Sequence, residues 1–166
     1  MTVIAAKVYD DKIVMSCDSQ ISRGYNKRNN VMPSKVIKGA DFLVGLCGDA
    51  TLITFLHMFS KNHPIGDGEE AAVIDWIVEF LEFIKKKTGN WHTAGNNQLL
   101  IAHKSGLYVI VDWAPIKVKD WYAIGSGFEY AEAALYLGRD TKTAVDVANE
   151  LCYGCGGNIE TFELTL

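Results

Sequence analysis

The sequence is poor in the features that mark disulfide-rich, nucleic-acid-binding and membrane proteins. Its 166 residues include three prolines and four cysteines, and the formal net charge is −4. A chain of this length has enough core residues to fold without disulfides, so we expect reduced cysteines and a cytoplasmic setting. The acidic balance disfavours nucleic acids and anionic membrane surfaces as partners.

Long apolar runs are absent as well. No stretch reaches the ~18 apolar residues that a membrane-spanning helix requires. The acidic pair Asp10-Asp11 stands near the start and no basic segment leads into an apolar run, so we expect no signal peptide. The composition is that of an ordinary globular protein, with 49% hydrophobic and 22% charged residues, and we expect one domain over residues 1–166.

The first part of the chain contains short β-branched and apolar runs joined by turns. We expect four strands, antiparallel because their connections are short, over Thr2–Tyr9, Lys12–Cys17, Lys35–Lys38 and Phe42–Cys47. The polar stretch Asp18–Ser34 is predicted to be a loop. Apolar residues then recur every three or four positions, which predicts two helices over Ala50–Ser60 and Glu69–Lys87.

A second series of elements follows in the same order. Strands are predicted over Gln98–His103, Leu107–Asp112, Ile116–Lys119 and Trp121–Ile124, helices over Phe128–Leu137 and Thr141–Cys152, and a last strand over Ile159–Leu166. Thr141 is the expected N-cap of its helix. Antiparallel sheets with helices on the outside indicate a layered α+β domain.

The start of the chain contains a candidate nucleophile, Thr2. If Met1 is removed, Thr2 has a hydroxyl and a free α-amine on the same residue. An α-amine has an ordinary pKa of ~8 and can take a proton from the hydroxyl, so Thr2 becomes nucleophile and base together. A small residue after the first methionine is common in proteins of every kind, so the rest of the chain must decide.

Two charged residues are predicted to lie beside Thr2. The hairpin turns at Asp10, and Thr2 and Asp18 each lie about eight residues from that turn, so they emerge at the same end of the sheet. Lys35 begins the third strand, and between Asp18 and Thr2 its ammonium would lower the free-energy cost of a Thr2 alkoxide. The simpler alternatives are a turn carboxylate and a surface lysine.

Two glycine-containing turns each lead into a predicted helix. Gly48 is either an ordinary strand-to-helix turn or the donor of a backbone N–H that stabilises an oxyanion. The turn Gly125-Ser126-Gly127 lacks the later glycine of a dinucleotide site, and Ser126 is a candidate to hydrogen-bond the Thr2 amine and relay its proton.

The pair Cys152 and Cys155 is a lone C-x-x-C motif. A zinc site would need a second pair with similar spacing, and a thioredoxin-type site would stand at the start of a helix rather than after one. This context favours a structural or incidental role.

Together these motifs resemble the proteasome β-subunit superfamily, and the HslV-like peptidases most of all. The resemblance extends over nearly the whole chain and is carried by Thr2 at the start of a strand, Cys17-Asp18-Ser19, Ser34-Lys35-Val36, Leu46-Cys47-Gly48-Asp49-Ala50 and Ile124-Gly125-Ser126-Gly127-Phe128-Glu129-Tyr130-Ala131.

The resemblance implies an Ntn-hydrolase fold, a four-layer αββα sandwich of two antiparallel sheets between helix layers. It also implies a threonine-type endopeptidase. Thr2 would be the nucleophile with its own amine as base, Asp18 and Lys35 would tune it, Gly48 would supply the oxyanion N–H, and Ser126 would assist.

The resemblance further implies a homo-oligomer of stacked hexameric or heptameric rings that degrades unfolded polypeptides supplied by an ATP-dependent, HslU-like unfoldase. The chemistry would need no cofactor. A structural Na⁺ or Mg²⁺ would be bound by the backbone carbonyls of Asn149, Cys152 and Cys155. Ile21 and Leu46 are the expected lining of an apolar substrate pocket beside Thr2.

Two features leave alternatives open. Proteasome subunits carry an aspartate and a serine where this chain has Cys152 and Cys155, and HslV also lacks the aspartate, which favours the HslV-like branch. A retained Met1 would block the amine, and the chain would then be an inactive ring-forming subunit. An Ntn amidase for a small amide would keep the chemistry without the ring.

Overall fold

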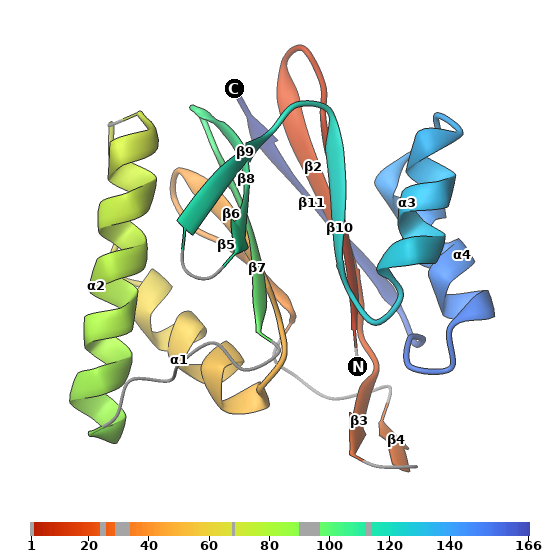
Figure 1. Cartoon of the computed structure of the whole chain (residues 1–166), viewed down its shortest axis with the longest axis horizontal. Helices are drawn as coiled ribbons and strands as arrows, with labels where there is room; N and C mark the ends of the chain where they lie inside the picture. Colours follow the sequence, from red (N-terminus) through yellow and green to blue (C-terminus); the bar gives the residue numbers. More distant parts are fainter. Residues whose placement is uncertain (1, 24–25, 29–33, 68, 90–96, 112–113) are drawn as a thin grey trace.

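The computed structural model describes residues 2–23, 26–28, 34–67, 69–89, 97–111 and 114–166. Met1, whose removal the prediction requires, lies outside these residues, as does Asp112 at the end of a predicted strand. Across the described residues, two main sheets lie face to face between two pairs of helices (Figure 1). The predicted four-layer α+β sandwich is therefore confirmed.

The first main sheet contains the first and the last strand of the described residues. Its strands are antiparallel and follow the spatial order β10, β1, β2 and β11, which span Trp121–Gly125, Val3–Val8, Lys12–Asp18 and Ile159–Thr165. In the hairpin, Ile4 of β1 is opposite Cys17 of β2. This register brings the start of β1 and the end of β2 to one edge, as the count from the turn predicts.

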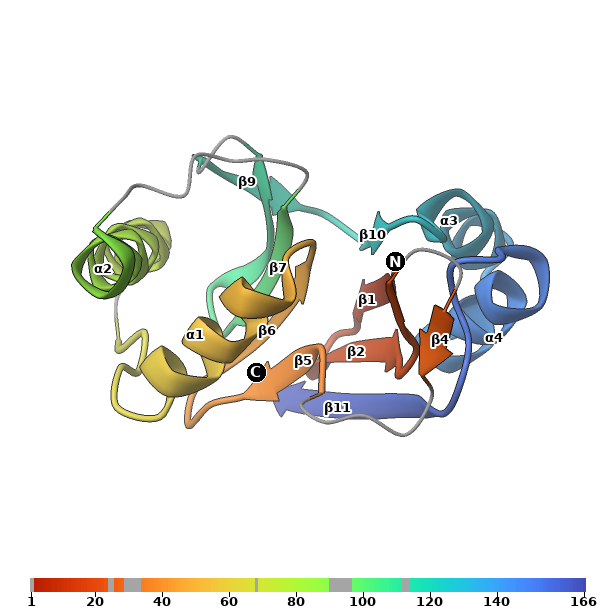
Figure 2. The same cartoon turned by 90° about the horizontal axis from the view of Figure 1, so that it is seen from below.

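The second main sheet is built from the middle of the chain. Its order is β5, β6, β7, β8 and β9, which span Val36–Lys38, Phe42–Cys47, Gln98–His103, Gly106–Val111 and Ala114–Val118. Helices α1 (Ala50–Ser60) and α2 (Glu70–Thr88) cover its outer face, and α3 (Phe128–Tyr136) and α4 (Thr141–Leu151) cover the first sheet (Figure 2).

Both faces of each sheet are covered, which explains why strands such as β1 and β6 are apolar at nearly every position. In β1, Ile4 faces the other sheet, whereas Val3 and Ala5 pack against α3 and α4. The cluster between the sheets consists of Ile4, Ala6, Ile13, Met15, Cys17, Val36, Leu43, Cys47, Leu100, Ala102, Leu107, Val109, Ile124 and Leu164.

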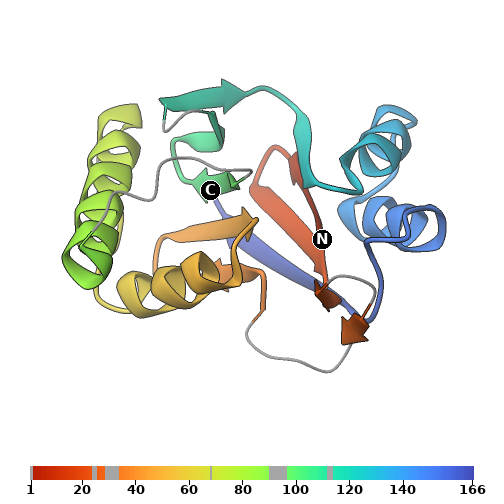
Figure 3. The same cartoon turned by 60° about the horizontal axis from the view of Figure 1, so that its bottom comes forward.

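Two predictions about local structure are wrong. The stretch 18–34 is not entirely loop, because β3 (Ile21–Arg23) and β4 (Asn26–Arg28) pair in an antiparallel hairpin near the start of β1 (Figure 3). A two-stranded ribbon is held by backbone hydrogen bonds and needs no alternation of apolar residues, so composition did not reveal it.

The N-cap of α4 is Asp140 and not Thr141. The Asp140 carboxylate accepts a hydrogen bond from Thr143 N at 2.7 Å. The Thr141 hydroxyl is instead buried and lies 2.7 Å from Ser16 Oγ, so it joins α4 to β2. A side chain committed to the core is not free to cap, and aspartate is at least as good a cap as threonine.

Candidate active site

A buried ion pair lies where β1 begins and β2 ends. Lys35 Nζ is 2.7 Å from Asp18 Oδ1, and the two side chains are 3% and 0% exposed. The same Asp18 oxygen accepts a hydrogen bond from Val3 N at 2.9 Å, and Gly156 N donates to the other oxygen at 3.2 Å. A buried carboxylate is costly unless its oxygens are satisfied, and three donors satisfy this one.

The ammonium of Lys35 is held by a second oxygen. Lys35 Nζ donates to the backbone carbonyl of Gln20 at 2.6 Å. The Lys35 backbone is also fixed, because its carbonyl accepts a hydrogen bond from Leu46 N at 3.1 Å, next to the pairing of β5 with β6. The lysine is thus joined to both main sheets, which fixes the position of its charge.

Thr2 is buried, and Ser126 contacts its backbone. Thr2 N donates to Ser126 Oγ at 3.2 Å, and Ser126 Oγ lies 3.2 Å from the Thr2 carbonyl oxygen, to which it donates. Gly127 N donates to the same carbonyl at 3.3 Å. The Thr2 nitrogen would be an α-amine once Met1 is removed, and Ser126 already contacts it.

The predicted catalytic residues therefore come together from distant parts of the sequence. Thr2 precedes Val3, whose N–H contacts Asp18, and Asp18 pairs with Lys35. Gly125 packs so tightly that a Cβ there would lie 2.2 Å from the Thr2 carbonyl oxygen and 3.0 Å from Cys47 Sγ. Gly48 follows Cys47 and lies at this same edge.

Gly48 adopts a backbone conformation that favours glycine. Its φ is +133°, a region that other residues rarely occupy, and it stands between β6 and α1. Asp49 caps α1 by accepting a hydrogen bond from Thr51 N at 2.7 Å. The start of a helix is a site of positive electrostatic potential, as an oxyanion site needs.

Two residues that support the site were missed by the sequence analysis. Asn97 Oδ1 accepts a hydrogen bond from Asp49 N at 2.9 Å, and Gln98 Oε1 accepts one from Gly125 N at the same distance. These adjacent amides hold the Gly48 turn and the Gly125 turn from the start of β7. Their signal in the sequence was a pair of adjacent amides at the point where an apolar strand begins.

The thiols near the site are poor nucleophiles. Burial raises the pKa of Cys47 well above its ordinary value, and burial, with a smaller contribution from the Asp18 charge, raises the pKa of Cys155 to about 12. Both thiols remain protonated at neutral pH, and only a thiolate attacks efficiently. A hydroxyl nucleophile is therefore the better candidate.

The loop after α4 fits a hard cation in its chemistry. Asn149 and Cys152 lie at the carboxyl end of α4, where backbone carbonyls lack helical partners and the helix dipole favours positive charge. Asn149 Oδ1 is among the buried atoms of the described residues without a hydrogen-bond partner. The Cys152 carbonyl accepts a hydrogen bond from Cys155 N at 3.0 Å and retains a second lone pair. Oxygen donors are what Na⁺ and Mg²⁺ need.

A metal ion bound by side chains would need a different set of ligands. Within the described ranges, no group of three or more histidine, cysteine, aspartate or glutamate side chains is placed to hold a metal ion. A zinc site at Cys152 and Cys155 therefore finds no further side-chain ligands there.

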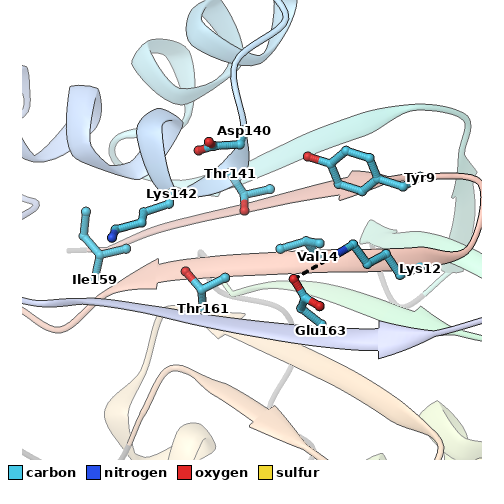
Figure 4. Close-up of a pocket in the computed structure, with 9 residues that line it drawn as sticks. All are labelled: Tyr9, Lys12, Val14, Asp140, Thr141, Lys142, Ile159, Thr161 and Glu163. Carbon is cyan, nitrogen blue, oxygen red and sulfur yellow. Dashed lines mark hydrogen bonds and ion pairs between the residues drawn. The ribbon is translucent and has the colours of Figure 1, made fainter.

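The predicted substrate pocket stays a prediction. Ile21 lies half-buried on β3, and Leu46 has no exposed surface and packs beneath α1 with Leu52. A pocket of about 540 Å³ lies elsewhere, between the start of α4 and strands β2 and β11 (Figure 4). An exposed ion pair between Lys12 and Glu163 lines it, and it contains none of the predicted catalytic residues.

No protein-family model and no curated protein matches the chain. Solved structures do match it. The structure of Thiobacillus denitrificans BPH in complex with epoxomicin has a TM-score of 0.86 and 21% identity, over 99% of this chain and 98% of that one. A second structure of the same protein matches with a TM-score of 0.82 and 20% identity, over the same shares of the two chains. The structure of eukaryotic HslV from Trypanosoma brucei matches with a TM-score of 0.66 and 16% identity, over 99% of each chain.

These matches show that the chain has the fold of HslV-like proteins from end to end, which confirms the resemblance at the level of the fold. The length and apolar character of the helices bear on membrane insertion. Among the described residues, none of the helices is long and apolar enough to cross a membrane.

Proposed function

We propose that this chain, after removal of Met1, is the subunit of a cytoplasmic threonine peptidase that assembles into stacked rings and cleaves unfolded polypeptides. The observation that carries the proposal is the convergence at Thr2. Ser126 contacts its nitrogen, while Asp18 holds both the next backbone N–H and the Lys35 ammonium. The HslV-like fold supports the ring, and the complex of a protein of similar fold with epoxomicin supports the choice of epoxomicin as a probe.

In the first step, Thr2 Oγ attacks the carbonyl carbon of the scissile amide and its proton passes to the α-amine. The new C–O bond leaves negative charge on the carbonyl oxygen, to which Gly48 N–H donates. The nearby Lys35 ammonium lowers the free energy of the negative charge that develops at Thr2. Collapse breaks the C–N bond, the α-ammonium protonates the leaving amine, and an ester on Thr2 remains.

In the second step, water attacks the ester carbonyl and gives its proton to the α-amine. The ester C–O bond breaks, Thr2 Oγ recovers a proton, and the carboxylic acid product leaves. Ser126 orients the amine in both steps. A cation bound by Asn149, Cys152 and Cys155 would supply positive charge that steadies this loop, and the proton transfers would be made by Thr2 itself.

The decisive test compares the processed wild type with Thr2→Ala and Thr2→Ser on an unfolded polypeptide substrate. We expect Thr2→Ala to abolish hydrolysis and Thr2→Ser to retain it, because serine keeps the hydroxyl and the amine. Intact mass must show that Met1 is gone from the active sample. Hydrolysis by the Thr2→Ala variant, or full retention of Met1 in active protein, would rule out the proposed chemistry.

Light scattering on the same samples separates the remaining alternatives. A stacked ring with peptidase activity agrees with the proposal, and a ring without activity indicates a structural subunit. A monomer or dimer that hydrolyses only small amides indicates an amidase. Addition of an ATP-dependent unfoldase is expected to accelerate the cleavage of folded substrates without affecting that of short peptides.

A further inference from the structure

Two thiols lie against Ser126, the residue that contacts the Thr2 nitrogen. The Cys152 thiol donates to the Ser126 carbonyl with a distance of 3.4 Å, and Cys155 Sγ is 3.8 Å from Ser126 Oγ. Gly127 adds to this contact, because a Cβ there would lie 2.7 Å from Cys155 Sγ. The C-x-x-C motif therefore supports the backbone and the side chain of Ser126 from the loop after α4.

The backbone separation of the two cysteines is compatible with a disulfide. Cys155 N donates to the Cys152 carbonyl at 3.0 Å, which closes a four-residue turn and keeps the two Cα atoms within about 7 Å. Native disulfides join Cα atoms about 4.4–6.8 Å apart. Both cysteines are free thiols.

The two cysteines also differ in access. Cys152 is half-buried, whereas Cys155 is only 2% exposed. An oxidant therefore meets Cys152 first, and Cys155 is placed behind it as the resolving thiol. A more accessible thiol with a second thiol beside it is one feature of cysteine pairs that respond to oxidants.

We infer that Cys152 and Cys155 are a redox modification site that a low-molecular-weight disulfide such as oxidised glutathione converts to an intramolecular disulfide. Cys152 Sγ attacks one sulfur of the oxidant, forms a mixed disulfide and releases one thiol. Cys155 Sγ then attacks Cys152 Sγ and releases the second thiol, and this step is slow because burial raises the pKa of Cys155 and keeps its thiolate scarce. Two electrons and two protons pass from the cysteine pair to the oxidant, which leaves as two thiols.

Oxidation changes the surroundings of Ser126. A disulfide has no S–H, so the hydrogen bond from Cys152 to the Ser126 carbonyl is lost, and Cys155 Sγ is drawn from Ser126 Oγ toward Cys152. Ser126 is the positioning residue for the Thr2 amine, so the amine loses its fixed environment. Slower reaction at Thr2 follows, and this consequence rests on the proposed function.

The test uses the processed full chain, incubated for hours with oxidised or reduced glutathione, since exchange at a buried thiol is slow. Intact mass and peptide mapping are expected to show a Cys152–Cys155 disulfide, which Cys152→Ser and Cys155→Ser abolish. Cys17→Ser, which changes a buried cysteine outside the pair, is expected to retain it. Labelling of Thr2 by epoxomicin should be about tenfold slower after oxidation, equivalent to about 1.4 kcal/mol in the barrier, and should recover with dithiothreitol.

A second measurement separates this inference from the peptidase proposal. The pKa of the Thr2 α-amine, followed by NMR, does not require activity and is expected to differ between the reduced and the oxidised protein. A shift in an inactive protein would support the redox site and reject the peptidase. Failure of the pair to form a disulfide would overturn the inference, as would a disulfide that changes neither labelling nor the amine pKa.

Discussion

At the scale of the residue, the site depends on a charge pair that costs free energy to bury. Asp18 and Lys35 are almost inaccessible to solvent, and each satisfies the other together with backbone groups from β1, Gln20 and Gly156. Such a pair adds little net stability by itself, but removing one partner leaves an uncompensated charge in the core. The pair is thus better explained by the proposed chemistry at Thr2 than by stability.

The first prediction concerns Lys35. Lys35→Met is expected to lower the free energy of unfolding by about 3–5 kcal/mol, because the Asp18 carboxylate remains buried without its cation. Epoxomicin labelling of the protein that is still folded should be slowed by about 100-fold or more, as when a preorganised donor is removed from a catalytic site. Denaturant unfolding and labelling kinetics measure the two effects.

The control for Lys35 is an exposed ion pair. Lys104 pairs with Asp67 on the surface, where their side chains are 47% and 101% exposed. Lys104→Met should change stability by less than about 1 kcal/mol and leave labelling unchanged. Equal effects of the two substitutions would contradict a special role for Lys35.

The second prediction concerns Ser126. Ser126→Ala removes the hydroxyl that joins Thr2 N and the Thr2 carbonyl, and one hydrogen bond of ~1 kcal/mol corresponds to a labelling rate about five- to tenfold lower. Ser105→Ala is the matched control, because Ser105 Oγ contacts His103 and Tyr108 instead. A labelling rate unaffected by Ser126→Ala would remove Ser126 from the site.

At the scale of the element, the entry into α3 holds the start of β1. Gly127 lies where α3, α4 and β1 meet, and a Cβ there would be 2.7 Å from Cys155 Sγ and 3.1 Å from both Ala148 Cβ and Val3 Cβ. Gly127→Ala is expected to destabilise the fold by about 1–3 kcal/mol through overpacking.

A second glycine distinguishes crowding from backbone strain. Gly138 follows α3 with φ at +80° and has open space around it. Gly138→Ala is expected to cost only about 1–2 kcal/mol, from the left-handed conformation alone, and to leave labelling of Thr2 unchanged. Gly127→Ala should slow labelling as well, because it displaces Val3. Identical labelling rates for the two variants would contradict the packing argument.

The cap of α4 makes a pH-dependent contribution to stability. Hydrogen bonds from Thr143 lower the pKa of Asp140 below its ordinary value. Because the folded-state pKa is the lower one, the contribution is complete above the unfolded-state pKa of ~3.9 and is lost as the pH falls through the folded-state pKa.

Asp140→Ala should therefore cost about 1 kcal/mol at pH 7, and less as the medium is made more acidic than pH 4. Asp140→Asn keeps a cap that does not titrate, so its stability relative to Asp140→Ala should be independent of pH. Thermal unfolding between pH 3 and 7 measures both. A cost of Asp140→Ala that does not change over this range would contradict the assignment of the cap.

Local pattern was enough to predict most elements, because both sheets are covered on two faces and strands such as β1 and β6 are apolar at nearly every position. Counting residues from the turn at Asp10 also placed Asp18 beside the start of β1, and β1 pairs as expected. The contributions of Asn97 and Gln98 could not be predicted, since they depend on how β7 meets two turns far away in the sequence. The small hairpin of β3 and β4 was missed for a similar reason, because backbone pairing leaves little trace in composition.

At the scale of the whole molecule, the four layers bring together strand ends from the two main sheets. Asp18 and Thr2 come from the first sheet, and Lys35 and Gly48 come from the second. The inter-sheet cluster that contains Ile4, Leu43 and Leu100 sets the distance between these two groups. The site is therefore a consequence of sheet packing, and it should be lost whenever the two sheets separate, even if each remains folded.

In the proposed reaction, the amine and the hydroxyl of one residue, Thr2, react as a unit. The most direct measurement is the intact mass and the N-terminal peptide map of the protein after treatment with epoxomicin. We predict a chain that begins at Thr2 and carries one molecule of the probe on that residue. A protein that retains Met1 in full, or a processed chain that carries no adduct on Thr2, would contradict the account.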